Sequence, residues 1–415
     1  MIIIHTMNDQ TTYLPRYLSK HISKALKSSP VVVITGARQT GKSTLVQHLG
    51  ERESRLYDSL DDIDTLELAS SNPDALVNRE GRISFDEVQR SPSLLLAVKR
   101  AVDKKRTAGR FILTGSANLL LMKRVSESLA GRAVYFSLLP FSRREVLGAG
   151  AVGIWQEFFT LPHTKWLDCI KGQSASKENW AECVLRGGYP VPSLHLSTDE
   201  ERTLWFTGYT RTYLERDLHE VGGVSSLVDF QRLMRGICLR LGNIVNQTDL
   251  ARDIGLSQPT VHRHLDLLEL SHQLVRLPAY SVNRTKRLIK SPKAYWTDTA
   301  IALHLSAEKQ PRGCHFENMI LCDLLAWRGS AKGQELFYWR TTTGEEVDFV
   351  IEWNGKLLAI EVKTTPNPRL ADARHLLTFR EQYKKTSLPA LLVHTGNEVR
   401  WLADGVLAVP WWKLL

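Results

Sequence analysis

The sequence predicts an α/β protein of more than one domain, and three observations lead to that prediction. A run of β-branched residues, Val31–Thr35, leads through a glycine-rich loop into a helical pattern. Further short apolar runs alternate with helical patterns up to residue 140, which is typical of a parallel sheet. A last group of strands lies between residues 337 and 363. The 415 residues leave room for two or three domains.

The loop after the first strand has the pattern of a phosphate-binding loop. Residues 36–43 fit G-x-x-x-x-G-K-[ST] between a strand and a helix, which is the context that the motif requires. Its backbone N–H groups would cradle phosphate oxygens, with Lys42 on the β/γ-phosphates and Ser43 on Mg²⁺. A chance glycine-rich turn is the alternative interpretation. The predicted nucleotide-binding residues are Gly36, Ala37, Arg38, Gln39, Thr40, Gly41, Lys42, Ser43 and Thr44.

Two carboxylates follow the next important strand. The stretch Arg82–Arg90 predicts a short strand that ends in Asp86 and Glu87. Ligands of parallel sheets bind at the carboxyl ends of the strands. We therefore predict that Asp86 coordinates Mg²⁺ through water and that Glu87 polarises the attacking water. An acidic pair on an ordinary surface is the alternative.

Two further groups of residues are candidates for sensing the γ-phosphate. The strand at residues 109–114 ends in Thr114, Ser116 and Asn118, any of which could contact that phosphate, although a strand-end turn explains them as well. Arg132 follows a helix end at Gly131, and its fixed charge suits an arginine finger or a sensor, in its own subunit or on a neighbour. An ordinary arginine at a helix C-terminus is the alternative.

Residues 247–268 predict a helix-turn-helix. Leu250, Ala251 and Ile254 form one apolar face, Gly255 permits the turn, and Ser257 can cap the second helix. The outward residues of that second helix are available for a DNA groove. These candidates are Gln258, Thr260, His262 and Arg263.

The segment after the helix-turn-helix predicts an extended basic wing. Residues 283–293 contain five cations and no acidic residue, which suits contact with DNA phosphates. A winged helix used for protein packing is the alternative. The DNA-binding candidates in the wing are Arg284, Lys286, Arg287 and Lys290.

The last hundred residues hold a second constellation of charged side chains. Strands at 337–340, 346–352 and 357–363 are joined in part by Asn354-Gly355, a type I′ hairpin signal. Strand periodicity places Glu361 and Lys363 on one face, and Asp348 can join them. This pattern resembles the PD-(D/E)xK nuclease core without its proline. The resemblance implies that Asp348 and Glu361 hold a divalent metal, that Lys363 activates water, and that Glu317 is the helix acid. A non-cleaving version of the core is the alternative.

Four motifs together carry a wider resemblance. Gly-Ala-Arg-Gln-Thr-Gly-Lys-Ser, Phe-Asp-Glu-Val-Gln, Leu-Thr-Gly-Ser-Ala and Leu-Ala-Gly-Arg resemble bacterial and archaeal AAA-type ATPases with a C-terminal DUF4143 domain, and Arg186–Pro190 resembles a Gly-Gly-aromatic-Pro signature of that family. We therefore expect an AAA-type ATPase core (1–147), a helical lid or linker (148–225), a winged helix-turn-helix (226–305) and a restriction-endonuclease-like α/β domain (306–415).

The overall composition narrows the setting. A formal charge of +10 and a pI near 9.3 favour a polyanionic partner. No apolar run is long enough to span a membrane, and the N-terminus lacks a signal-peptide core, so we expect a cytoplasmic protein. The five cysteines lack metal-binding spacing and are expected to be reduced thiols without zinc. They are Cys169, Cys183, Cys238, Cys314 and Cys322.

Three functional hypotheses remain at this stage. The leading one is a homo-oligomeric ATPase, dependent on ATP and Mg²⁺, that is coupled to DNA binding or remodelling. The second is an ATP-regulated, metal-dependent DNA endonuclease. The third is a nucleotide-gated regulatory or scaffold protein that does not process DNA.

Overall fold

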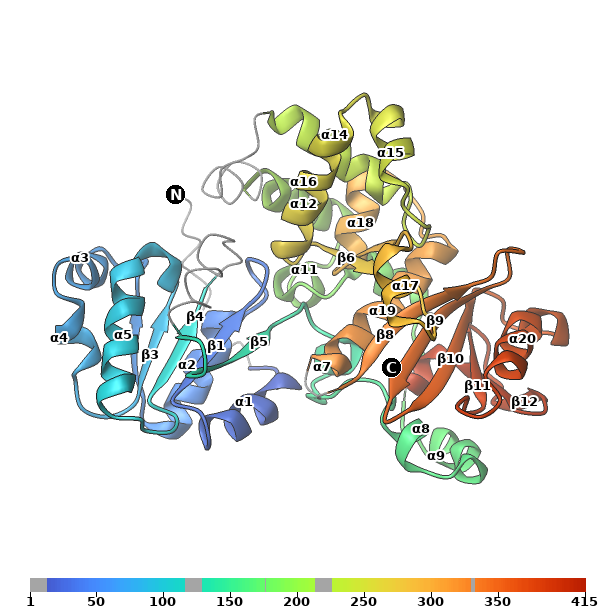
Figure 1. Cartoon of the computed structure of the whole chain (residues 1–415), viewed down its shortest axis with the longest axis horizontal. Coiled ribbons are helices and arrows are strands. Elements are labelled where there is room, and N and C mark those ends of the chain that lie inside the picture. The colour runs from blue at the N-terminus through green and yellow to red at the C-terminus, as the bar shows by residue number, and fades with distance from the viewer. Residues whose placement is uncertain (1–12, 116–128, 176, 213–225, 330–332) are drawn as a thin grey trace.

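The two larger β-sheets lie at opposite ends of the molecule, and helical segments and a winged helix lie between them (Figure 1). The computed structural model describes residues 13–115, 129–175, 177–212, 226–329 and 333–415. In that part of the chain, no helix combines the length and the apolar character that a bilayer crossing needs.

The N-terminal domain is a parallel sheet of five strands in the order β2-β3-β4-β1-β5. The prediction of a parallel α/β domain is confirmed. Side chains alternate along β1, so that Val31 and Val33 pack towards α3–α5 whereas Val32 and Ile34 pack towards α1 and α2. The elements are α1 Leu18–Leu26, β1 Val31–Thr35, α2 Lys42–Glu53, β2 Leu56–Ser59, α3 Ile63–Ser71, α4 Pro73–Val77, β3 Ile83–Asp86, a 3₁₀ turn Val88–Arg90, α5 Pro92–Lys104, β4 Phe111–Thr114 and β5 Ala133–Ser137.

The segment after β5 is helical, as predicted, but its first half packs on the C-terminal domain. The backbone N–H of Gly153 and the indole Nε1 of Trp155 both donate to Asp323 Oδ1 in that domain, at 2.8 and 2.6 Å. Residues around α8 and α9 therefore cover the C-terminal domain and do not form a lid over the nucleotide loop (Figure 1). The helices are α7 Arg143–Val146, α8 Glu157–Thr160, α9 Trp166–Lys171, α10 Trp180–Arg186, α11 Pro190–Leu194 and α12 Asp199–Thr212.

A winged helix follows, with the predicted helix-turn-helix at its centre. Gly255 ends α15 with φ +68°, and the Ser257 hydroxyl caps α16 by accepting the N–H of Thr260 at 3.3 Å. Strands β6 and β7 pair antiparallel, but residues 284–289 between them form a helix instead of the predicted extended wing. The elements are α14 Leu227–Cys238, α15 Gln247–Ile254, α16 Gln258–Leu270, β6 Leu274–Leu277, α17 Arg284–Ile289, β7 Lys293–Trp296 and α18 Thr299–Ser306.

The C-terminal domain is a mixed sheet in the order β12-β13-β11-β10-β9-β8. Asn354 and Gly355 both have positive φ between β9 and β10, as the predicted type I′ turn requires. One continuous apolar core joins this sheet to the winged helix and to α8–α12. The elements are α19 Gly313–Arg328, β8 Glu335–Arg340, β9 Glu346–Trp353, β10 Lys356–Lys363, a 3₁₀ turn Leu370–Ala373, α20 Arg374–Gln382, β11 Ala390–His394, β12 Arg400–Ala403, β13 Val406–Pro410 and α21 Trp411–Leu414.

Candidate functional site

The phosphate-binding loop connects β1 to α2 at the carboxyl edge of the parallel sheet. A side chain at Gly36 would place its Cβ 2.3 Å from the carbonyl oxygen of Leu138, and Gly41 has φ +89°, so both positions require glycine. Lys42 begins α2, is 5% exposed, and donates through Nζ to the carbonyl oxygens of Gly36 at 3.1 Å and Ala37 at 2.8 Å. The ammonium thus already lies within the loop.

The loop is also held by a hydrogen bond from an arginine that sequence reasoning missed. The buried guanidinium of Arg16 donates to the Thr40 carbonyl oxygen at 2.8 Å and to Glu145 Oε1 at 3.1 Å. Glu145 Oε1 also accepts the N–H of Tyr17 at 2.7 Å, which holds the start of α1 to α7. A lone arginine before a helix and a glutamate 129 positions later give no joint pattern in the sequence, since only the tertiary fold brings them together.

Asp86 lies beside the loop, as predicted for the end of a parallel strand. It is 3% exposed, and its carboxylate accepts hydrogen bonds from the hydroxyl of Tyr57 at 2.7 Å and from the hydroxyl of Thr114. Burial and the Asp86 carboxylate raise the pKa of Tyr57, whereas a hydrogen bond with Ser43 opposes that shift. The two predicted Mg²⁺ residues, Ser43 and Asp86, therefore meet at one phenol that sequence reasoning missed.

The backbone of Glu87 has a conformation that residues other than glycine rarely adopt. Its φ is +55°, and its carboxylate accepts a hydrogen bond from the side-chain amide of Gln89. The positive φ turns the chain sharply at the end of β3, next to Asp86. Among the γ-phosphate sensor candidates, Thr114 contacts Asp86, while Ser116 and Asn118 lie outside the described residues.

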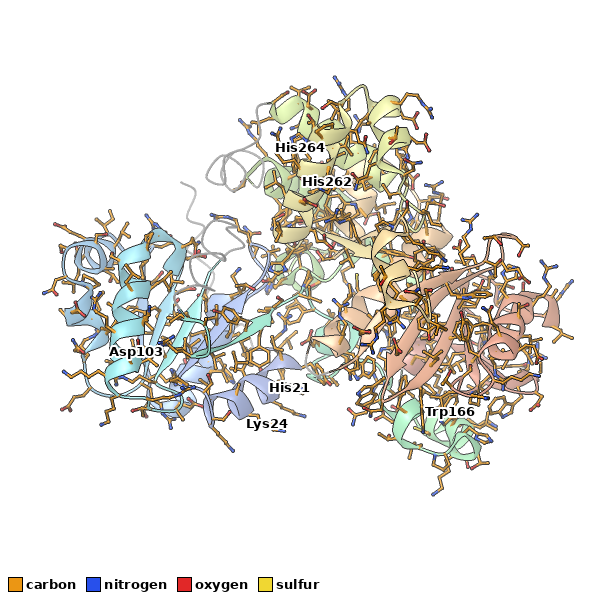
Figure 2. The ribbon with its side chains drawn as sticks, in the orientation of Figure 1. His21, Lys24, Asp103, Trp166, His262 and His264 are labelled. Atoms are coloured by element: carbon orange, nitrogen blue, oxygen red, sulfur yellow. The ribbon has the colours of Figure 1, made fainter. Side chains whose placement is uncertain are left out.

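Arg132 lies at the amino-terminal ends of the parallel strands, whereas the loop lies at their carboxyl-terminal ends. It directly precedes β5, which runs parallel to β1, whereas the loop follows β1. A strand of five residues spans roughly 15 Å. Arg132 Nε instead contacts Asp103 Oδ1 in α5 at 2.5 Å; Figure 2 labels Asp103. The prediction that Arg132 serves its own nucleotide loop is therefore wrong, and a role on a neighbouring subunit stays a prediction.

A series of contacts through α11 and α12 connects the loop to the winged helix. The nearest atoms to a Cβ placed on Gly41 include Pro190 of α11, at 3.9 Å. The hydroxyl of the neighbouring Tyr189 pairs with that of Tyr209 at 2.8 Å. Gln273 lies directly before β6, and its Nε2 donates to the Tyr209 hydroxyl at 3.0 Å. Burial and the charge of Lys42 lower the pKa of His272, next to Gln273, to about 4. The end of α16 is thus within electrostatic reach of the loop lysine.

The DNA-binding candidates divide into two groups. On α16, Gln258, His262 and Arg263 are exposed and Thr260 is half-buried, whereas His264 on the same helix is buried against Phe230. Figure 2 marks His262 and His264 on this helix, far from Lys24 of α1. On α17 and directly after it, the exposed candidates are Arg284, Lys286 and Lys290.

Arg287 does not belong to a DNA-binding surface. It is 9% exposed, and its guanidinium contacts Glu352 at 2.6 Å and Glu335 at 3.3 Å, both in the C-terminal sheet. The guanidinium also lies 4.6 Å from the ring centroid of Phe337. The prediction of Arg287 as a DNA contact is wrong because α17 packs this side chain against β8 and β9.

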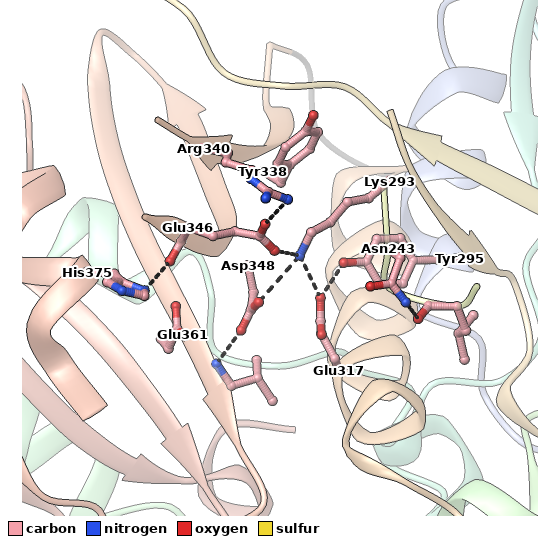
Figure 3. A network of polar contacts seen from close by, with 12 residues as sticks. Asn243, Lys293, Tyr295, Glu317, Tyr338, Arg340, Glu346, Asp348, Glu361 and His375 are labelled. Atoms are coloured by element: carbon pink, nitrogen blue, oxygen red, sulfur yellow. Dashed lines mark hydrogen bonds and ion pairs between the residues drawn. The ribbon is translucent and has the colours of Figure 1, made fainter. Parts of the chain in front are cut away.

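The acidic residues of the C-terminal domain meet at one place (Figure 3). The register that pairs Phe349 with Ile360 brings Asp348 opposite Glu361, and Glu317 approaches from α19. Burial and the charge of Asp348 raise the pKa of Glu317 to about 7 and that of Glu361 to about 8. Lys363 contacts Glu361 Oε1 at 2.7 Å, as strand periodicity predicted. The four residues that resemble a nuclease site are therefore gathered, with one addition.

That addition is Lys293 of β7, which sequence reasoning had placed in the basic wing. Its Nζ lies 2.5 Å from Glu346 Oε1, 3.3 Å from Glu317 Oε1 and 3.5 Å from Asp348 Oδ1. These three carboxylates outweigh the effect of burial and raise the pKa of Lys293. In the described parts of the chain, no cluster of His, Cys, Asp or Glu side chains is arranged to hold a metal ion. The nuclease metal implied by the resemblance does not fit here.

ATP and Mg²⁺, in contrast, fit the N-terminal site. The loop keeps both glycine positions, an ammonium inside it, and a helix that begins at Lys42. Residues 36–44 would hold the phosphates, and Ser43 with Asp86 would hold Mg²⁺. Bound ATP supplies the phosphoanhydride bond on which hydrolysis acts.

The fold and the N-terminal site define a P-loop ATPase domain of the AAA type, joined to a winged helix and a second α/β domain. Family models match residues 28–147 as an AAA domain, 177–312 as a domain of unknown function (DUF8612) and 312–414 as a domain of unknown function (DUF4143). The chain belongs to the family of AAA-type P-loop ATPases that carry a C-terminal DUF4143 domain.

Relatives span nearly the whole chain. The uncharacterized protein Rv2008c of Mycobacterium tuberculosis is 30% identical over 405 residues, which cover 95% of this chain and 83% of the relative. The uncharacterized protein MJ1544 of Methanocaldococcus jannaschii is 22% identical, over 83% of this chain and 77% of its own. Among solved structures, a Walker-type ATPase of Pyrococcus abyssi is similar, with 17% identity, a TM-score of 0.45, and coverage of 69% of this chain and 94% of that one.

Proposed function

We propose that this protein hydrolyses ATP with Mg²⁺ and couples that cycle to DNA binding through the exposed face of α16. The observation that carries the proposal is the placement of the winged helix. Its recognition helix α16 presents Gln258, His262 and Arg263 to solvent. Beyond the other end of α16, Gln273 contacts Tyr209, and the Tyr209 hydroxyl pairs with that of Tyr189, which precedes the α11 proline beside the loop. A ligand at either site would then bias the position of one rigid module.

The proposed chemistry assigns a role to each nucleotide-site residue. Lys42 neutralises phosphate charge, Ser43 and Asp86 hold the metal ion, and Glu87 accepts the proton of the attacking water. Arg16 acts on the loop through the Thr40 carbonyl, so it is a positioning residue. Thr114 positions Asp86 by donating to its carboxylate.

The proposed subunit arrangement is a homo-oligomer. Arg132 faces away from the loop of its own chain and its side chain is 27% exposed, so the arginine of one copy would serve the site of the next. The cytoplasm remains the proposed location. The nuclease alternative is not adopted, because Lys293 lies among the acidic residues that such a metal would need.

A direct test of the DNA surface is the double variant Gln258→Ala, Arg263→Ala. An arginine that reads a base edge contributes about 1–3 kcal/mol, so duplex DNA affinity should fall by about 5-fold to 150-fold. The measurement is fluorescence anisotropy with labelled single-stranded, duplex and branched DNA at low and high salt, with the ATPase rate read on the same samples.

The matched control for this test is Lys24→Ala, which removes an exposed cation of α1 in another module (Figure 2). It should leave DNA affinity and its salt dependence unchanged. If the double variant binds as tightly as the native chain, or if no DNA binds at all, the winged helix serves protein packing instead.

The coupling path predicts a second effect, at Tyr209. Tyr209→Phe removes the hydroxyl that contacts both Tyr189 and Gln273, and the loss of such buried hydrogen bonds costs about 1–3 kcal/mol. We expect the basal ATPase rate to stay within about twofold while stimulation by DNA is lost. Steady-state ATPase assays with and without duplex DNA measure both quantities.

Tyr383→Phe is the control, because the Tyr383 hydroxyl accepts a hydrogen bond from the Trp339 indole at 3.3 Å in the C-terminal domain, away from the path. It should keep DNA stimulation. Equal stimulation in the Tyr209 variant would show that the tyrosine pair does not transmit the nucleotide state.

A further inference from the structure

The position of Lys293 is unusual for a lysine of a winged helix. Its side chain is 2% exposed, and it leaves β7 to enter the C-terminal domain (Figure 3). An ammonium group has three N–H donors. Here it faces three carboxylates, one from α19 and two from β9. Those carboxylates belong to Glu317, Glu346 and Asp348.

The surroundings hold each carboxylate in place around this ammonium. The Tyr295 hydroxyl donates to the same Glu317 oxygen that Lys293 contacts. Asp348 Oδ2 accepts the backbone N–H of Val362 at 2.9 Å, so its other oxygen is directed to Lys293. Arg340 contacts the second oxygen of Glu346 at 3.3 Å. The lysine therefore lies in a built site and is not a chance surface contact.

The same acids would be the metal ligands if the nuclease-like core worked as its resemblance implies. A divalent ion would need oxygen ligands at about 2.0–2.6 Å, so it would compete with the Lys293 ammonium for the same carboxylate oxygens. The Lys293 contacts of 2.5, 3.3 and 3.5 Å are those of an ammonium ion pair. Glu361 Oε2 is buried beside them without a hydrogen-bond partner among the described residues, so the cluster has a spare ligand.

We propose that Lys293 is a built-in cation that takes the place of a divalent metal ion in this acid cluster, so that the cluster fastens the winged helix to the C-terminal domain. Without the ammonium, Glu317, Asp348 and Glu361 would be free to close around a divalent cation. The inference goes beyond the ATPase function and is independent of it.

Other contacts along the same seam agree with a fastening role. The N–H of Tyr280 donates to the Tyr338 carbonyl oxygen of β8 at 2.6 Å, and Arg287 contacts Glu352 at 2.6 Å. The Asn318 side chain of α19 accepts the N–H of Trp296 and donates to its carbonyl oxygen, both at 2.8 Å. The Lys293 ion pairs therefore join the same two modules that these hydrogen bonds and the Arg287 ion pair also hold together.

The test is the binding of Mn²⁺ to the nucleotide-free full chain, counted from the electron paramagnetic resonance signal of the free ion. Lys293→Met keeps the length of the side chain and removes its charge. This variant should bind one more Mn²⁺ per chain than the native protein. The double variant Lys293→Met, Asp348→Asn should lose that extra ion, which places it in the cluster and separates it from any ion near Asp86.

Two further variants keep the test decisive. Lys293→Arg retains a cation and should bind no extra Mn²⁺, while Lys356→Met removes an exposed lysine of β10 and should behave as the native chain. If Lys293→Met is unstable without metal, Mn²⁺ should raise its unfolding temperature and leave that of the native chain unchanged. Native protein that binds Mn²⁺ in an Asp348-dependent way would overturn the proposal, as would a folded Lys293→Met chain that gains no ion.

Discussion

Replacing Lys42 by alanine should weaken ATP binding severely and remove ATP hydrolysis. Lys42 is 5% exposed, and its ammonium donates to the carbonyl oxygens of Gly36 at 3.1 Å and Ala37 at 2.8 Å, so it already lies where phosphate oxygens would bind. Truncating one partner of a buried, hydrogen-bonded charge pair costs about 2–5 kcal/mol. The affinity for ATP should therefore fall by about 30-fold or more, and hydrolysis should fall with it.

Isothermal titration with ATP and Mg²⁺ measures the first effect, and phosphate release measures the second. Lys104→Ala, which removes an exposed lysine at the end of α5, is the control and should bind ATP as the native chain does. An unchanged ATPase rate in Lys42→Ala, with the protein folded by circular dichroism, would contradict the assignment of the nucleotide site. Because Lys42 begins α2 in the N-terminal domain, whereas the acid cluster lies in the C-terminal domain at the other end of the molecule (Figure 1), this failure would leave the Lys293 inference untouched.

The parts of the fold that follow from local pattern could be predicted from the sequence. The strand, loop and helix around residues 36–43 need only neighbouring residues, and Gly41 has a positive φ that favours glycine there. The same holds for the Ser257 cap of α16 and the Asn354-Gly355 turn. Asp86 came together with the loop because parallel strands end at one edge.

The same rule explains the error at Arg132. A residue that precedes a strand of a parallel sheet lies at the amino edge, away from a loop that follows another strand. The charge of Arg132 and its place after a helix end are typical of a sensor arginine, but its position directly before Ala133 puts it at the amino-terminal end of β5. The information was in the sequence once the strand after Arg132 was assigned to the same sheet.

Lys293 and Arg287 could not be placed from local pattern. A run of cations without acids is typical of a surface that binds phosphates, and it gives no sign of carboxylates that lie 24 or more positions away. Their partners come from α19, β8 and β9, so their roles depend on how the winged helix docks on the C-terminal sheet. Such long-range charge pairing is a property of the tertiary fold.

Glu87→Gln should leave ATP binding nearly unchanged and stop hydrolysis. The amide has the shape of the carboxylate and can keep the contact with Gln89, but it cannot accept a proton from water. Loss of a general base lowers a rate by about 10²–10⁴-fold, so the turnover number should fall by that factor while the dissociation constant of ATP moves by less than about threefold.

The positive φ of Glu87 indicates that its backbone is held in place for a function at the end of β3. A non-glycine residue at φ +55° is strained by roughly 1–3 kcal/mol, and such strain at the end of β3 is maintained only where the surrounding structure fixes it. Glu80→Gln changes an exposed glutamate of the same domain and should hydrolyse ATP at the native rate. Comparison of single-turnover hydrolysis with equilibrium ATP binding separates the two effects. If Glu87→Gln turns over normally, the water is activated by another group, and Asp86, which contacts Tyr57 and Thr114 at the same strand end, becomes the residue to replace next.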